Sequence, residues 1–91
     1  MRKKLLFLQK AGSADILMSL LLNDGKMYFS ELQDAIGRGS ISTLNTRILE
    51  LKNQGLLLDE QEEKFGGRRY FWLTEKGKRV AGHLKEIEKI L

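Results

Sequence analysis

The feature that most constrains the fold is a pair of amphipathic helix patterns joined by a glycine-containing turn, within residues 30–55. In the second, longer pattern the apolar side chains recur at i, i+3, i+7 and i+10, which places them on one face of an α-helix. These residues are Ile41, Leu44, Ile48 and Leu51. Ser40 can cap this helix, and Gly55 stands where a left-handed residue commonly follows a helix end. The sequence therefore predicts a helix over residues 41–54 with one buried face.

The first pattern of the pair is shorter. Ser30 and Gln33 have the spacing of a capping box before an apolar stripe that ends at Gly37, which predicts a helix of about two turns. The stretch 37–39 (Gly-Arg-Gly) then joins the two helices. Two helices joined by a few residues that include glycine form a helix-turn-helix arrangement.

Two further elements are expected upstream. Ser13 can cap a helix that ends near Asn23, with a turn at residues 24–25. Residues 2–10 predict a short helix that stops at Gly12, and residues 27–29 predict a very short strand.

A hairpin is expected downstream. Residues 56–58 begin one strand, and residues 69–73 are rich in the aromatic residues that strands favour. The pair Gly66-Gly67 supplies the bend. Strand alternation directs Phe71 and Leu73 to the core and leaves Tyr70 and Trp72 on the other face. Thr74 can cap a last helix.

These elements together predict an α+β fold that is mostly α: a winged helix-turn-helix domain with a three-helix core, a β-hairpin wing and a C-terminal helix. The 91 residues contain no proline and no low-complexity linker, so we expect one domain over 1–91. Its winged-helix core is expected over 13–74, and its C-terminal helix over 75–91.

Charge is unevenly distributed along the chain. The net charge is +4, but four acids and no base lie in residues 59–63, whereas six bases and one acid lie in residues 64–79. Grouped positive charge favours a polyanionic partner. Because carboxylates repel phosphates, the acidic run is expected to face away from nucleic acid while Lys64, Arg68 and Arg69 project.

The residue types exclude several other chemistries. The chain has no cysteine and a single histidine, His83, so a zinc site of histidine or thiolate ligands is not expected. No nucleophile, base and orienting residue share a meaningful spacing, so neither an enzyme nor a cofactor is expected. No apolar run approaches the roughly 18 residues of a membrane span, and the apolar stretch 5–8 is too short for a signal peptide. A cytoplasmic location is the default.

Three stretches carry a family resemblance: YFSELQDAIG, ISTLNTRILELKNQGLL and FGGRRYFWLTEKGKR. Across about residues 14–82 the chain resembles small winged-helix transcription regulators of the PadR, MarR and HxlR type. The resemblance implies a recognition helix over 41–54 in the major groove and a wing over 61–69 on the DNA backbone or in the minor groove. It also implies a dimerisation role for the last helix. Trp72 stands where a polar or basic residue is commoner in these families.

Candidate contacts with double-stranded DNA come from the helix 41–54 and from the wing. The side chains opposite the apolar stripe are small and hydrogen-bonding, and arginines flank them. The expected DNA-binding residues are Arg38, Ser40, Ser42, Thr43, Asn45, Thr46, Arg47, Lys64, Arg68 and Arg69. Leu49 does not fit the buried stripe.

A homodimer is expected because the two ends of the chain carry more apolar side chains than one small core needs. The expected interface residues are Leu5, Leu8, Val80, Leu84, Ile87 and Leu91. The N-terminal segment packing on the C-terminal helix of the same chain is the alternative. A small-molecule effector is not identified, and a pocket at the dimer seam is the place where one would fit.

Three functions stay open on these residues. The first is sequence-specific DNA binding by a transcription regulator. The second is architectural DNA binding without sequence preference. The third is a winged helix that binds another protein, which is suggested by the small number of bases, Arg47 and Lys52, in the helix 41–54.

Overall fold

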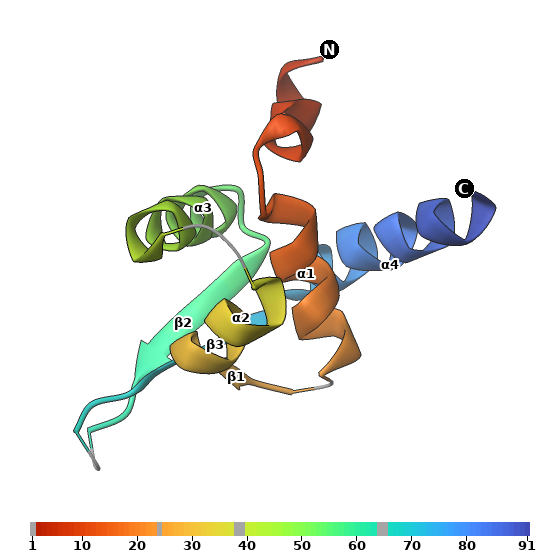
Figure 1. The fold of residues 1–91 in the computed structure, drawn as a ribbon. Helices are drawn as coiled ribbons and strands as arrows, with labels where there is room; N and C mark the ends of the chain where they lie inside the picture. The colour runs from red at the N-terminus through yellow and green to blue at the C-terminus, as the bar shows by residue number, and fades with distance from the viewer. Residues whose placement is uncertain (1, 24, 38–39, 64–65) are drawn as a thin grey trace.

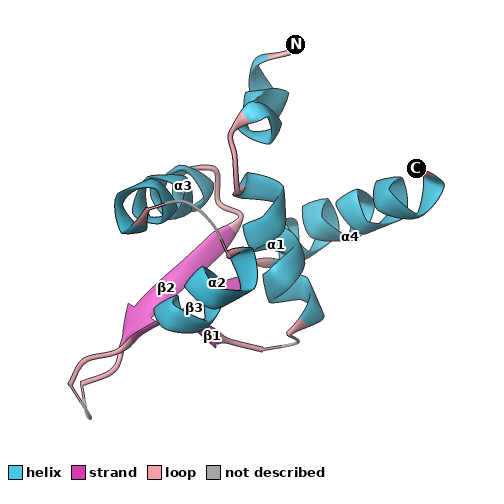
Figure 2. Cartoon of the chain, viewed as in Figure 1, coloured by secondary structure: helices cyan, strands magenta, loops and turns pink. Residues whose placement is uncertain are grey.

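The computed structural model describes residues 2–23, 25–37, 40–63 and 66–91. A small antiparallel sheet lies at one side of the helices, and both chain ends project from the body (Figures 1 and 2). The elements are the 3₁₀ helix η1 (Lys3–Gln9), α1 (Ser13–Leu22), β1 (Met27–Tyr28), α2 (Phe29–Ile36), α3 (Ile41–Asn53), β2 (Leu57–Gln61), β3 (Arg69–Leu73) and α4 (Glu75–Ile90). This order confirms the predicted winged helix-turn-helix fold.

The sheet has the strand order β1-β3-β2, and every pairing is antiparallel. In the central strand, Phe71 lies opposite Met27 on one side and Asp59 on the other. The next pair, Leu58 and Trp72, points to the opposite face because side chains alternate along a strand. The sheet therefore has an inner face that contains Phe71 and an outer face that contains Trp72.

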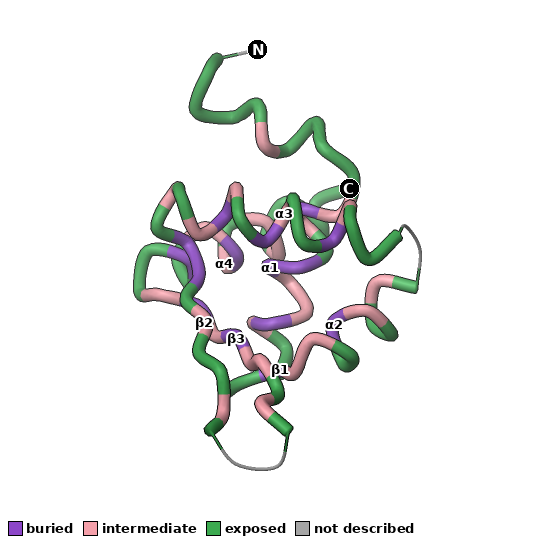
Figure 3. Tube along the Cα trace, turned by 90° about the vertical axis from the view of Figure 1, so that its left-hand side faces the viewer, coloured by how far each residue is buried: buried purple, intermediate pink, exposed green. Residues whose placement is uncertain are grey.

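The core lies between the inner face of the sheet and the helices (Figure 3). Phe71 is fully buried at its centre, as predicted. The other fully or nearly fully buried apolar residues are Ile16, Leu17, Leu20, Met27, Leu32, Leu44, Ile48, Leu51, Leu56, Leu57, Leu73 and Ala81. The core thus joins every helix from α1 to α4 to the sheet.

Helix α4 is divided along its length. Gly77 and Ala81 are buried, so its first half belongs to the core. Its second half extends away from the body, where Ile87 is 51% exposed (Figure 1). The division into a core over 13–74 and a helix over 75–91 stays a prediction. Buried residues continue past residue 74 into the first half of α4.

Two predicted caps are confirmed. Ser40 Oγ accepts a hydrogen bond from the Thr43 amide at 3.0 Å, and Thr74 Oγ1 accepts one from the Gly77 amide at 2.9 Å. Gly55 has φ 75°, the left-handed conformation expected after α3. Each of these caps involves only neighbouring residues, which is why the sequence was sufficient to predict them.

Two other predicted caps were wrong. Helix α1 begins at Ser13, which is buried, and its cap is Gly12 at φ 93°. Helix α2 begins at Phe29 rather than after Ser30. There the Glu31 carboxylate accepts a hydrogen bond from the Tyr28 amide at 2.8 Å. In both cases the helix starts earlier than predicted. At α1 the left-handed Gly12 precedes the first turn, and at α2 the local hydrogen bond between Tyr28 and Glu31 caps the earlier start.

Two smaller expectations also differ. Ile41, the first residue of the predicted apolar stripe, is 57% exposed because the first turn of α3 extends past the core. The helix expected over residues 2–10 has 3₁₀ geometry and buries none of its residues. Only Phe7 of its described residues packs against the core, and it is partly buried.

The described residues offer neither a membrane-spanning helix nor a metal-binding cluster. No single helix there is long and apolar enough to cross a membrane, and the pair η1 and α1, which meets the length together, is bent by 82°. No group of three or more histidine, cysteine, aspartate or glutamate residues in those ranges is placed to hold a metal ion.

Candidate nucleic-acid interface

One face of α3 is left open to solvent. Ser42, Asn45, Thr46 and Leu49 are all exposed and share this face, opposite the buried side of the helix. Thr46 Oγ1 donates a hydrogen bond to the Ser42 carbonyl oxygen at 3.0 Å, so its acceptor lone pairs remain available. Leu49, which did not fit the buried stripe, is 56% exposed on the same surface. The face is polar with one apolar side chain.

The predicted residues at the start of α3 take part in its cap. The Ser40 and Thr43 hydroxyl oxygens lie 3.0 Å apart, in addition to the hydrogen bond from the Thr43 amide. Their side chains therefore stand at the N-terminus of α3, where backbone amides favour anions. Arg38, predicted to contact DNA just before this point, lies outside the described residues.

Arg47 lies on one flank of α3 and is held by intramolecular contacts. Its Nε donates a hydrogen bond to the Ala11 carbonyl oxygen at 3.3 Å, and its Nη1 lies 2.5 Å from Glu50 Oε1. Lys10 Nζ lies 3.2 Å from the other oxygen of Glu50. Arg47 thus connects α3 to the segment before α1.

The other flank of α3 contacts the wing. Arg69 Nη2 lies 2.7 Å from Asp59 Oδ2, and Arg69 Nη1 donates a hydrogen bond to Asn45 Oδ1 at 3.2 Å. Lys52 Nζ lies 2.7 Å from the second Asp59 oxygen. Partial burial by itself would raise the pKa of Asp59, but the hydrogen bonds and charges of Lys52 and Arg69 outweigh it. The pKa therefore lies below its ordinary value.

The wing turns at the predicted glycines. Gly66 and Gly67 have φ of 81° and 69°, a conformation that glycine adopts without strain. Below the turn, the Glu62 amide donates to the Arg68 carbonyl oxygen at 2.9 Å, and Gln61 Nε2 donates to the Gly67 carbonyl oxygen at 2.9 Å. Lys64, at the predicted basic tip, lies outside the described residues.

Two carboxylates of the acidic run accept hydrogen bonds from tyrosine hydroxyls. The hydroxyl of Tyr70 donates to Glu60 at 2.8 Å, and the hydroxyl of Tyr28 donates to Glu62. These hydrogen bonds are the first cause of the raised pKa of both tyrosines, and burial and the carboxylate charges add to them. Arg68 Cζ lies 3.8 Å from the centre of the Tyr28 ring, a cation–π contact. Arg68 is exposed, while Arg69 is held on the inner face.

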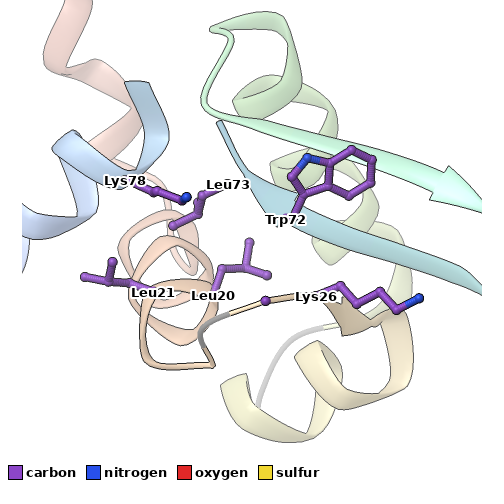
Figure 4. A pocket seen from close by; sticks show the side chains of 7 residues that line it. Leu20, Leu21, Lys26, Trp72, Leu73 and Lys78 are labelled. Carbon is purple, nitrogen blue, oxygen red and sulfur yellow. The ribbon is translucent and has the colours of Figure 1, made fainter. Parts of the chain in front are cut away.

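Trp72 lies on the outer face of the sheet, stacked on Tyr70 with ring centres 5.6 Å apart. It borders a hollow of about 430 Å³ between the sheet, the end of α1 and the start of α4 (Figure 4). The hollow is lined by Leu20, Leu21, Gly25, Lys26, Trp72, Leu73 and Lys78. Trp72 therefore belongs neither to the buried core nor to the exposed face of α3.

The residues predicted to form a dimer interface gather around a groove of about 580 Å³ between η1, α4 and the end of α3. Leu5 and Leu8 line it from η1 and are 46% and 36% exposed. Val80, Leu84 and Ile87 line it from α4. Leu91, at the chain end, is 99% exposed and is not among the lining residues.

Sequence reasoning missed Asp59 and Lys52 as members of the contact between α3 and the wing. Asp59 belongs to the acidic run that was expected to face away from nucleic acid. Strand alternation carried a signal, because Asp59 pairs with Phe71 and so shares the inner face of the sheet with Arg69. Lys52 could be found only from the packing of α3 against β2.

Comparison with known proteins identifies the family of this chain. The pattern of the HxlR-like helix-turn-helix family matches residues 12–91, which is most of the chain. The chain belongs to that family. It is therefore a member of a helix-turn-helix family of DNA-binding transcription regulators, as its sequence predicted.

Solved structures share the HxlR-like fold of this chain. A protein from Porphyromonas gingivalis W83, described as a MarR-family transcriptional regulator, is 25% identical with a TM-score of 0.86; 97% of this chain and 84% of that chain are covered. The reduced form of the transcriptional regulator YodB from B. subtilis is 24% identical with a TM-score of 0.80, covering 98% and 89%.

Sso10a-2, described as a DNA-binding protein from Sulfolobus solfataricus, is 24% identical with a TM-score of 0.67; 85% of this HxlR-like chain and 78% of that chain are covered. Among curated proteins, none matches this chain at a significant level.

Proposed function

We propose that this chain is a transcription regulator that binds double-stranded DNA in a sequence-specific manner. Helix α3 enters the major groove, and the wing over residues 61–69 lies on the backbone or in the minor groove. One observation carries the proposal: Arg69 of the wing is hydrogen-bonded to Asn45 of α3, so helix and wing present one connected surface. Such a regulator acts in the cytoplasm and needs no cofactor for this contact.

The contacts divide by chemistry. Ser42, Asn45 and Thr46 are exposed hydrogen-bonding groups of the size that reads base edges, and Leu49 can pack on a thymine methyl group. The remaining predicted residues serve the phosphates, which position the protein. These are Arg38, Ser40, Thr43, Arg47, Lys64, Arg68 and Arg69.

Binding to duplex DNA should weaken steeply with salt. If about six phosphates are neutralised in the complex, the logarithm of the binding constant falls against the logarithm of salt concentration with a slope near −5. Replacing Arg68 and Arg69 together by alanine should make the slope shallower by about 2, because two phosphate contacts are lost. Fluorescence anisotropy across a salt series measures both. A flat salt dependence of the unaltered protein would reject DNA binding.

Sequence preference separates this proposal from architectural binding. Selection from a pool of random duplexes should enrich a half-site, because hydrogen-bonding side chains on α3 discriminate between base pairs. Recovery of an unenriched pool with tight binding would favour an architectural protein instead.

A protein-interaction module is the third candidate, and Arg47 favours it. Because Arg47 is held by Glu50 and the Ala11 carbonyl oxygen, α3 presents few uncommitted bases to DNA. If the doubly substituted wing variant, Arg68→Ala with Arg69→Ala, binds DNA as well as the unaltered protein, this candidate moves ahead.

We also propose that two copies associate through the groove between η1 and α4. Its exposed leucines and Ile87 are apolar surface that a partner would cover. Gln54 also lines the groove, and its Oε1 is buried without a hydrogen bond among the described residues. A second copy can bury this apolar surface. In the structure η1 and α4 both line this groove, which stays open between them.

Replacing Ile87 by glutamate should convert the dimer to a monomer, because it places a charge in the apolar groove. The variant Ile90→Glu is the control, since Ile90 is 83% exposed and does not line the groove. Sedimentation equilibrium measures the mass of each. A monomeric unaltered protein at high micromolar concentration, or a dimeric Ile87→Glu variant, would contradict the proposed interface.

A further inference from the structure

Asp59 holds three elements of the interface together. Its two carboxylate oxygens each lie 2.7 Å from a different base, Lys52 on α3 and Arg69 on β3. Its side chain is 16% exposed, so most of it is withdrawn from solvent. A partly buried carboxylate that binds two bases is geometrically more constrained than a surface ion pair.

The Arg69 side chain is fixed from several directions. While Nη2 meets Asp59, Nη1 donates a hydrogen bond to Asn45 on the exposed face of α3. Its Cζ also lies 5.0 Å from the centre of the Phe71 ring in the core. Since the guanidinium group is a rigid planar fork, contacts at both nitrogens determine its orientation. The chain Lys52–Asp59–Arg69–Asn45 therefore links the end of α3, both wing strands and the DNA-facing surface.

We propose that Asp59 is a positioning residue for DNA recognition, which sets the distance and angle between α3 and the wing. This inference rests on the proposed function. In the proposed complex α3 contacts base edges while the wing contacts the DNA backbone. Both contacts contribute to DNA affinity only when the helix and the wing can bind the same site simultaneously. A rigid link between them reduces the cost of ordering on binding. Asp59 contributes to DNA binding without touching DNA, although its charge has the same sign as the phosphates.

Charge and geometry predict opposite effects for one substitution. In Asp59→Asn the side chain keeps its size but loses its charge. Removing a negative charge near DNA should leave affinity for random duplex unchanged or raise it a few-fold. Loss of the link should instead lower affinity for the selected site. We expect the ratio of selected-site to random-duplex affinity to fall about tenfold, the discrimination that one well-placed contact supplies.

The matched control is Glu60→Gln, which makes the same charge change on the same strand. Glu60 lies on the outer face and hydrogen-bonds Tyr70, away from α3. It should show the charge effect alone, with the ratio unchanged. A second variant, Arg69→Lys, keeps the charge but loses the fork. It should lower the ratio while leaving the salt slope within about one unit of the unaltered protein.

The outcomes separate the two proposals. Affinities are measured for proteins shown by thermal unfolding to be folded at the assay temperature. If the unaltered protein enriches no site, the proposed function fails and the positioning role fails with it. Suppose instead that the unaltered protein enriches a site, and that Asp59→Asn and Arg69→Lys keep its ratio of selected-site to random-duplex affinity. The positioning role alone is then overturned. A reduced ratio in both variants, with an unchanged ratio in Glu60→Gln, supports it.

Discussion

Replacing Gly77 by alanine should lower the free energy of unfolding by at least about 3 kcal/mol. A Cβ atom at this position would lie 1.8 Å from the Leu56 carbonyl oxygen and 2.9 Å from its carbonyl carbon. Both are backbone atoms, so no side chain can move aside, and α4 would have to shift. The same Leu56 oxygen accepts a hydrogen bond from the Thr74 amide at 3.1 Å, which such a shift would strain. Chemical denaturation at fixed protein concentration measures the change.

Gly82 provides the control on the same helix. A Cβ atom there would meet nothing within 4 Å. Because glycine is unfavourable in a helix interior, Gly82→Ala should stabilise the protein by up to about 1 kcal/mol. If Gly77→Ala were as stable as the unaltered protein, the close contact between α4 and the Leu56 backbone would be wrong.

Replacing Thr46 by glutamate should reduce affinity for duplex DNA about a hundredfold, for selected and random sequences alike. Thr46 lies at the centre of the exposed face of α3. In the proposed complex its carboxylate would lie within about 6 Å of phosphates, where like charges at an effective dielectric constant near 20 cost about 3 kcal/mol. Glutamate is a good helix former, so α3 itself should remain intact. Fluorescence anisotropy at low salt measures the loss.

Leu58→Glu controls for the change in net charge. Leu58 is 47% exposed on the outer face of the sheet, opposite Trp72. It adds the same single negative charge away from α3 and should weaken binding only a few-fold, since salt screens distant charges. Equal losses in the two variants would show that α3 does not enter the DNA.

Residues whose roles depend on close sequence neighbours were predicted well. The buried stripe of α3 follows from helical spacing, and Leu44, Ile48 and Leu51 are all buried. The caps at Ser40 and Thr74 follow because a short polar side chain can reach an amide three residues on. Strand alternation correctly separated Phe71 from Trp72.

Residues whose roles depend on distant partners were predicted less well. Ser13 looked like a cap but is buried in the first turn of α1, because the chain enters that helix through Gly12. Arg47 looked like an uncommitted base, yet it contacts the Ala11 carbonyl oxygen, 36 residues away in the chain. No local pattern carries such a contact, since it depends on how whole helices pack.

The sequence by itself determined the order and type of most elements, the winged helix-turn-helix class and the polar face of α3. Each of these depends on spacing within a few residues, which backbone geometry converts directly into a face or a cap. Only the tertiary structure decided that Asp59 joins Lys52 to Arg69, and that Arg69 reaches Asn45. Electrostatic interactions depend on distance in space and not on separation along the chain. Asp59, which the sequence predicted to face away from DNA, therefore links the wing to α3 in the folded protein.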